Sequence, residues 1–239
     1  MRRSHTSHTP LTIAFLLFVT LVPTACQRSA STTAPVASSA TSPANAKDRL
    51  LTEQWNKAVR GLEFETTSGL VEVERVAGGT PETAAEHLAA ADDLLAGNQI
   101  VEAMERYGLA ARHDPDLADA YVGMGLLLTR KGKHEKAIVS FRTALDRDAS
   151  HLDARYRLAM ALWSASRQYD AIDEMNRLLT EDDSHARAHE RLAVWHYFTG
   201  DFASAWHHLH RAEDLGQQVP GQLAVLLSQR MVDPGLPGE

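Results

Sequence analysis

The feature that most constrains the fold is an internal period of 34 residues. Ala103, Ala137, Ala171 and Ala205 stand 34 residues apart, and the small or apolar residues around them keep the same phase. A second helical pattern lies about 17 residues before each alanine, so each unit is a pair of helices. One helix pair cannot bury both of its apolar faces, and such units therefore stack into a solenoid. The uninterrupted period predicts four units, at 84–117, 118–151, 152–185 and 186–219.

The period and its residue types resemble the tetratricopeptide repeat (TPR) family. The second unit carries the fullest pattern, with Tyr121, Met124, Gly125, Leu128, Gly132, Ala137, Phe141 and Ala144. The other units depart from it at the aromatic opening position, which holds His87, Arg155 and His189. The resemblance spans roughly 136 of the 239 residues. It implies an all-α fold, a right-handed TPR α-solenoid of four helix pairs whose repeats hold other proteins.

Small residues are expected where the two helices of a unit cross. Gly125, Ala159 and Ala193 occupy such positions, where a larger side chain would overpack by about 1–3 kcal/mol. Large side chains one turn beyond each repeated alanine should fill the core; these are Tyr107, Phe141, Met175 and Leu209. Turns are predicted at Gly97-Asn98, Lys131-Gly132, Ser164 to Ser166 and Thr199-Gly200.

A solenoid also needs caps at its ends. Residues 220–231 have Leu223, Leu226, Leu227 and Met231 at helical spacing and are predicted to form a capping helix, followed by a loose tail at 232–239. Residues 47–80 are predicted to be an N-terminal helical segment, because Leu51, Trp55, Val59 and Leu62 recur on one helix face. This amphipathic helix either caps the first unit or occupies a binding groove. The stretch 69–76 alternates Val and Glu, which fits a short strand or a second helix.

The N-terminus has the pattern of an export signal. Arg2 and Arg3 precede an apolar run from Leu11 to Val22, which is too short for a spanning helix of roughly 20 residues. Cys26 follows and is the only cysteine in the chain. The string resembles the lipobox of bacterial lipoproteins, although Pro23 stands where that family prefers Leu. The resemblance implies a signal peptide at 1–25 and acylation of Cys26, with palmitate among the expected lipids; the alternative is a plain signal peptide with an incidental cysteine.

Residues 26–46 are rich in Ser, Thr, Ala and Pro and are predicted to be a disordered tether. Removing Arg2 and Arg3 with the signal leaves 22 basic residues against 31 acidic ones, a formal net charge of −9. An acidic body argues against nucleic acid as a partner and leaves membrane attachment to the acyl chains. Gln27, which is not Asp, favours the outer membrane by the family's sorting rule, with the domain facing the periplasm.

In TPR proteins the first helices of successive repeats line a concave groove, and the resemblance carries that role to matching positions here. The predicted groove residues are Leu88, Asp92, Val122, Leu126, Tyr156, Met160, Trp163, Glu190, Val194 and Tyr197, with Leu95 and Thr129 beside them. The Lys and Asn clamp with which some members hold a peptide carboxylate is not at the matching positions. The groove is mainly apolar and suits an amphipathic helix or an apolar peptide segment.

Catalytic chemistry has no support in the sequence. His207, His208 and His210 are neighbours on one helix and point about 100° apart, so they do not meet on one ion. His189 and His196 lie on one helix face, and the repeat register turns both toward the partner helix. No metal ligand set, catalytic residue or cofactor is expected. The predicted function is that of a lipid-anchored, non-enzymatic scaffold for an envelope complex; the alternative is an exported metal- or small-molecule-binding accessory protein that uses the His-rich fourth repeat.

Overall fold

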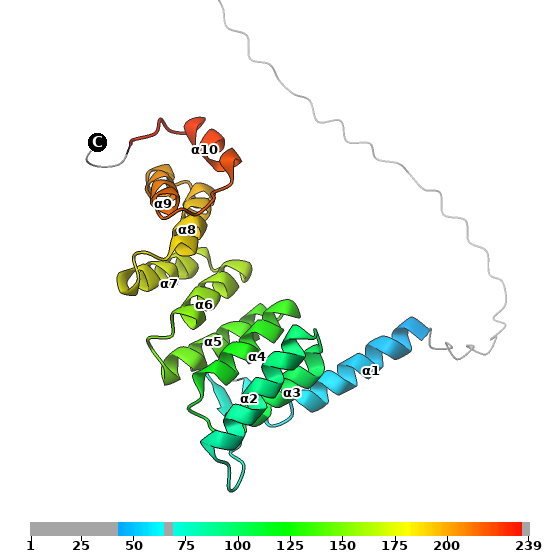
Figure 1. Cartoon of the computed structure of the whole chain (residues 1–239). Coiled ribbons are helices and arrows are strands. Elements are labelled where there is room, and N and C mark those ends of the chain that lie inside the picture. Colours follow the sequence, from blue (N-terminus) through cyan, green and yellow to red (C-terminus); the bar gives the residue numbers. More distant parts are fainter. Residues whose placement is uncertain (1–42, 65–68, 236–239) are drawn as a thin grey trace, which may run out of the picture. The chain divides into compact units, whose positions relative to one another are not determined.

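The computed structural model describes residues 43–64 and 69–235, with side chains described from residue 47 onward. The signal peptide, Cys26 and nearly all of the tether lie outside these residues, as does the end of the tail. Helices dominate the described residues, and one two-stranded sheet stands among them (Figure 1). Their order is α1 Pro43–Ala58, β1 Leu62–Phe64, β2 Val71–Val73, α2 Pro81–Ala96, α3 Ile100–His113, α4 Ala118–Arg130, α5 His134–Arg147, α6 Leu152–Ser164, α7 Gln168–Glu181, α8 Ala186–Thr199, α9 Phe202–Asp214 and α10 Gly221–Ser228. None of the helices in these ranges is long and apolar enough to cross a membrane.

The helices form four antiparallel pairs, α2–α3, α4–α5, α6–α7 and α8–α9, and each second helix also contacts the first helix of the next pair. This is the all-α solenoid that the period predicts. Helices α4, α6 and α8 begin at Ala118, Leu152 and Ala186, where the period places the starts of the second, third and fourth units. Helix α2 begins earlier than its unit, at Pro81, because Thr80 caps its first turn by accepting a hydrogen bond from the backbone N–H of Thr83 (3.4 Å).

The core follows the repeated alanines. All four are fully buried, and so are the large side chains one turn beyond them: Tyr107, Phe141, Met175 and Leu209. Gly125 lies against the Phe141 ring, where an added Cβ would be 2.5 Å from Cε1, so the predicted close crossing is confirmed. A Cβ added to Gly123 would be closer still, 2.2 Å from Cε1 of Tyr107 in the preceding pair. Both glycines let an aromatic ring reach the backbone of α4, which packs the first two pairs tightly.

The turn inside each pair has the same geometry in all four repeats. The residues at its apex have positive φ: Asn98 (58°), Gly132 (68°), Ser166 (62°) and Gly200 (85°). The following backbone N–H donates to a carbonyl oxygen five residues earlier, as from Lys133 to Leu128 (2.9 Å) and from Arg167 to Leu162 (2.9 Å). This left-handed cap satisfies carbonyl groups at the end of each first helix. The structure therefore confirms the four predicted turns.

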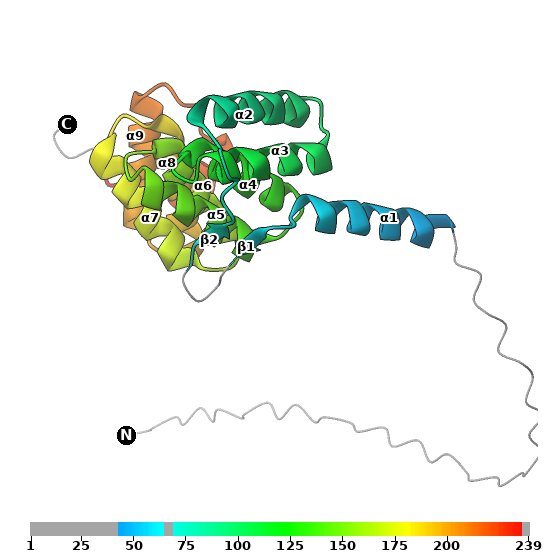
Figure 2. The same ribbon diagram turned by 90° about the horizontal axis from the view of Figure 1, so that it is seen from below.

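The N-terminal segment differs from the prediction in two ways. Helix α1 begins at Pro43, inside the predicted tether, and β1 and β2 pair as an antiparallel hairpin in place of a continuous helical segment. Of the two alternatives for 69–76, the short strand is confirmed. Glu63 pairs with Glu72 in the hairpin register. The alternation of Val and Glu at 71–74 buries Val71 and exposes Glu72, which is a strand pattern. Figure 2 shows the hairpin beside α5, and α1 extending away from the helix pairs.

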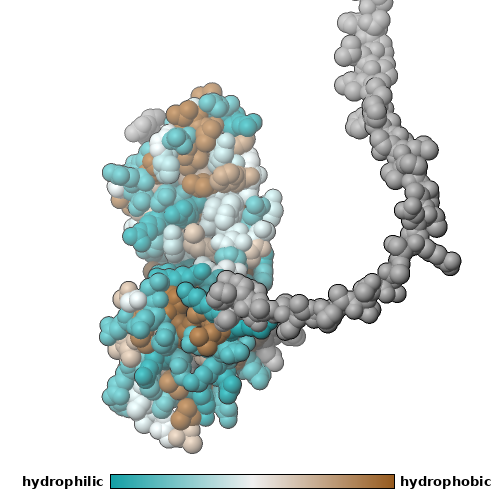
Figure 3. All heavy atoms as spheres, turned by 90° about the vertical axis from the view of Figure 1, so that its right-hand side faces the viewer, coloured by the Kyte–Doolittle hydropathy of each residue, from teal (hydrophilic) through white to brown (hydrophobic). Residues whose placement is uncertain are grey.

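The C-terminal helix α10 packs on α9 through Leu223 and Leu227, as expected of a cap. Its other face is apolar and exposed, with Val225 and Leu226 accessible and Met231 just beyond the helix. Figure 3 shows hydrophobic surface at this end of the molecule. The buried residues of α9 and α10 form a cluster of their own with Ala193, separate from the cluster that runs through the first three pairs to Trp195.

Candidate protein-binding groove

The predicted groove is built from one face of each first helix, α2, α4, α6 and α8. Its aliphatic members are partly exposed and rest on the core, with the exception of Val122, which is buried. Leu126 and Met160 hold equivalent positions in α4 and α6, one repeat apart, and Val194 follows in α8. These side chains are accessible enough to contact a partner, and the core beneath them holds them in place.

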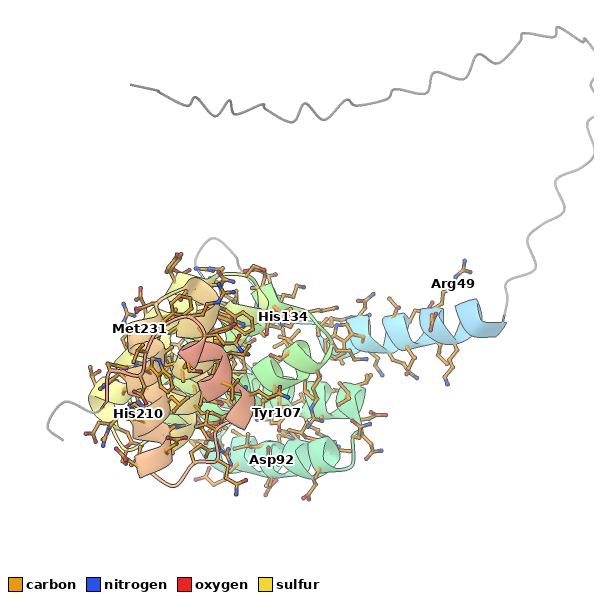
Figure 4. All side chains as sticks on the ribbon, turned by 90° about the horizontal axis from the view of Figure 1, so that it is seen from above. Arg49, Asp92, Tyr107, His134, His210 and Met231 are labelled. Carbon is orange, nitrogen blue, oxygen red and sulfur yellow. The ribbon has the colours of Figure 1, made fainter. Side chains whose placement is uncertain are left out.

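Both acids of the predicted groove have partners within the chain. The hydroxyl of Tyr107 donates to Asp92 Oδ1 at 2.6 Å, and burial together with this carboxylate raises the pKa of Tyr107. Figure 4 shows Asp92 on α2 facing Tyr107 on α3. Glu190 Oε2 accepts a hydrogen bond from Gln217 Nε2 at 3.1 Å. Asp92 therefore supports a buried tyrosine, and neither carboxylate is an isolated charge awaiting a ligand.

The aromatic members of the groove bridge the third and fourth repeats. Trp163 stacks on Trp195 of α8, with ring centroids 4.8 Å apart and planes 6° apart. Tyr156 stacks on His185, the N-cap residue of α8, at 5.5 Å. One alternative placed the N-terminal helix in the groove, over Trp163 and Tyr156. The structure places α1 against α3 instead. The last groove aromatic, Tyr197, lies against Phe202 at 6.0 Å.

A second surface, which the sequence does not predict, is the face of α5 that the β1–β2 hairpin covers. The backbone N–H of Val71 donates to Thr143 Oγ1 at 2.7 Å, and Thr143 is fully buried under the hairpin. Val139, Ser140 and Thr143 occupy positions that hold Asp173, Glu174 and Arg177 in the third repeat. That local loss of charge on a second helix was the available signal that another segment covers α5.

The end of α1 packs beside the same region. Trp55 is buried, and the ammonium groups of Lys133 and Lys131 lie 5.0 and 5.5 Å from its ring centroid. Arg112 of α3 donates from Nε to the carbonyl oxygen of Glu74 (2.9 Å). The N-terminal segment is thus fixed to the second helices α3 and α5.

The histidines of the fourth repeat lie between α8 and α9. His189 and His196 both face His208 of α9, as the repeat register predicts. His210 turns to Asp233 instead (3.2 Å). Within the described residues, no three His, Cys, Asp or Glu side chains come together as a metal-binding set.

Comparisons with known proteins agree with this architecture. Residues 88–149 and 122–186 match the family model for the tetratricopeptide repeat. The fold is similar to that of MamA from Desulfovibrio magneticus RS-1, with a TM-score of 0.52 and 20% identity over 56% of this chain and 75% of that one. A tetratricopeptide repeat protein from Parabacteroides merdae is similar with a TM-score of 0.56 and 17% identity, over 62% and 60% of the two chains. The first TPR of Spaghetti (RPAP3), bound to an HSP90 peptide, is similar with a TM-score of 0.50 and 15% identity, over 52% of this chain and 99% of that one. No curated protein matches the sequence.

Four consecutive helix pairs, stacked in one register with a buried alanine at the same position of each, define an α-helical repeat protein. The 34-residue spacing, the alanine and aromatic positions and the matching family model identify the kind of repeat. Residues 88–186 match the tetratricopeptide repeat, and the stacked helix pairs have the fold of solved tetratricopeptide repeat proteins.

Proposed function

We propose that this protein is a non-catalytic scaffold that holds a partner protein along the face formed by α2, α4, α6 and α8. The observation that carries the proposal is the row of partly exposed apolar side chains in equivalent positions of successive first helices, notably Leu126, Met160 and Val194. Apolar side chains at regular spacing on a preformed surface suit the apolar face of an amphipathic helix or an apolar peptide segment.

The chemistry of the groove argues for an apolar partner rather than an acidic one. The HSP90 peptide bound by the Spaghetti repeat, SRMEEVD, carries three acidic residues. Here the groove itself contributes Asp92 and Glu190, and it has no Lys or Asn at the clamp positions. Because like charges repel, a peptide rich in acids would be disfavoured.

We propose further that the scaffold is an exported lipoprotein, acylated at Cys26 and tethered to the outer membrane on its periplasmic side, where it supports an envelope complex. The support is the apolar run from Leu11 to Val22, the single cysteine after it and the Ser/Thr/Ala/Pro segment that follows. The acyl chains would supply membrane attachment without a spanning helix.

The groove is tested by the double change Leu126→Glu and Met160→Glu. Two carboxylates in the middle of the apolar row should lower partner recovery in an affinity pull-down from cell envelopes by at least about tenfold, since each would be desolvated on binding. Circular dichroism should show unchanged helix content.

The matched control is Tyr169→Glu, an apolar-to-acid change at a side chain of α7 that is 73% exposed and lies outside the groove. It should leave recovery intact. Full recovery with the groove variant would overturn the proposal, and equal loss with Tyr169→Glu would show that the partner does not use the groove specifically.

A further inference from the structure

One pair of equivalent positions, 19 residues apart, stands on the two helices of each repeat, and its chemistry changes along the stack. The pairs are His87/Arg106, Tyr121/Ser140, Arg155/Glu174 and His189/His208. In the third repeat Arg155 and Glu174 form an ion pair at 3.5 Å. In the fourth repeat the same place holds two imidazole rings, with His189 Nδ1 and His208 Nδ1 2.9 Å apart. We refer to His189 and His208 as the histidine clasp.

The hydrogen bonds of the clasp fix where its protons are. His189 Nε2 lies 3.0 Å from the carbonyl oxygen of Asp183. A carbonyl only accepts, so Nε2 carries the proton and Nδ1 of the neutral ring is an acceptor. His208 Nδ1 must then be the donor to His189. A proton added to His189 Nδ1 would set two N–H groups against each other at 2.9 Å, and the clasp would break.

The groups around the clasp would stabilise a positive charge on either ring only weakly, because two of them are further histidine rings. His196 of α8 stacks on His208 with centroids 5.5 Å apart, and His207 of α9 lies edge-on to it at 5.2 Å. Burial, followed by the neighbouring His189, His196 and His207, lowers the pKa of His208 to about 3, against a smaller raising effect of Asp201. Burial also lowers the pKa of His196 against the opposing effect of Asp201.

The pKa of His189 is lowered chiefly by burial. Its hydrogen bond to the Asp183 carbonyl and the Asp183 charge act against this, while Arg211 and His207 lower it further. The Asp183 carboxylate also lies 3.9 Å from Arg211, which offsets part of its charge. All three facing histidines are thus neutral in the folded protein at neutral pH.

We propose that the histidine clasp makes the fourth repeat acid-sensitive, so that mild acid separates α9 and its cap α10 from α8 while the α4–α5 and α6–α7 pairs stay folded. The core supports such a division, because the buried residues of α9 and α10 form a cluster separate from the main one. This inference does not depend on what the groove binds.

The direction in which pH changes the stability of the fourth repeat follows from proton linkage. An unfolded histidine titrates near its ordinary pKa of about 6.5, whereas the folded clasp resists protonation until lower pH. Between these limits the open state binds more protons, so the stability of the fourth repeat falls as the pH falls. One imidazole suppressed to a pKa of about 3 would favour the open state about 30-fold at pH 5.

The test is hydrogen–deuterium exchange of the full chain at pH 7.5 and pH 5.0, corrected for the intrinsic exchange rates. Protection of α8–α9 peptides should fall about tenfold or more relative to α4–α5 peptides. The variant His189→Tyr with His208→Ser copies the non-titrating pair of the second repeat, in which Tyr121 donates to the carbonyl of Pro115 at 3.0 Å just as His189 donates to Asp183. It should lose most of the response, whereas His207→Gln, which removes an exposed ring with a smaller effect on the pKa of His208 than His189 or His196, should retain most of it.

Equal loosening of α4–α5, or an undiminished response in the copied pair, would overturn the proposal. If the copied pair fails to fold, nitrogen NMR of the wild-type imidazoles decides the matter. In the folded protein His189 and His208 should both titrate below the ordinary histidine pKa, and a titration of both near pH 6.5 would count against the clasp.

Discussion

At the scale of single residues, the turn inside each repeat shows how one backbone requirement selects different side chains. The apex residue has positive φ in all four repeats, and it is glycine at Gly132 and Gly200 but Asn98 and Ser166 elsewhere. Left-handed backbone is unfavourable for residues with a Cβ, and asparagine tolerates it better than most. Ser166 therefore carries backbone strain that the other three turns reduce or avoid.

Replacing Ser166 with glycine should relieve that strain. We expect Ser166→Gly to raise the free energy of unfolding by about 0.5–1 kcal/mol, because the gain at positive φ exceeds the entropy that glycine loses on folding. Urea denaturation followed by circular dichroism measures the change. The reciprocal variant Gly132→Ser should be destabilised, and a neutral result in both would mean that the turns tolerate a Cβ at this φ.

The residue scale also shows which site residues could be inferred from the sequence. The register places Leu126, Met160 and Val194 in equivalent positions from spacing alone. It gives no indication that Trp163 stacks on Trp195 or that Asp92 accepts a hydrogen bond from Tyr107, because these contacts depend on how far each helix is displaced from its neighbour. Position in the repeat was predictable, whereas the partner of each side chain was not.

At the scale of elements, the helix pairs were predictable, whereas β2 was only one of two alternatives and β1 was not predicted. Four copies of one pattern fix the starts of α4, α6 and α8, since each copy supports the assignment of the others. Strands of three residues, at Leu62–Phe64 and Val71–Val73, carry little periodicity. They are stable because they pack on α5, through a contact between Val71 and Thr143 that spans 72 residues of sequence.

That contact can be removed with little change in shape by Thr143→Val. The Val71 N–H would remain buried without an acceptor, and we expect a loss of about 1–3 kcal/mol in the free energy of unfolding and faster exchange of the Val71 amide. Thr129→Val is the matched control, because Thr129 also donates to a carbonyl four residues earlier but lies in the groove face of α4. A comparable loss in both variants would refute a specific role for the hairpin contact.

At the scale of the whole molecule, attachment to a membrane is a prediction from Cys26. We expect Cys26→Ser to move the protein from the detergent phase to the aqueous phase on detergent partitioning, and to abolish incorporation of labelled palmitate. The control Ser29→Ala, three residues away, should partition like the wild type. Detergent partitioning of Cys26→Ser that matches the wild type would rule out acylation as the anchor.

The hairpin also has a mechanical consequence for whatever lies in the groove. It contacts α3 and α5 together, so the first two repeats are joined by a strap on their outer side as well as by their core. The third and fourth repeats have no counterpart among the described residues, and their junction contains two stacked ring pairs beside the shared core. A partner bound along the first helices would therefore contact a surface braced by the hairpin at the first two repeats and an unbraced surface at the last two.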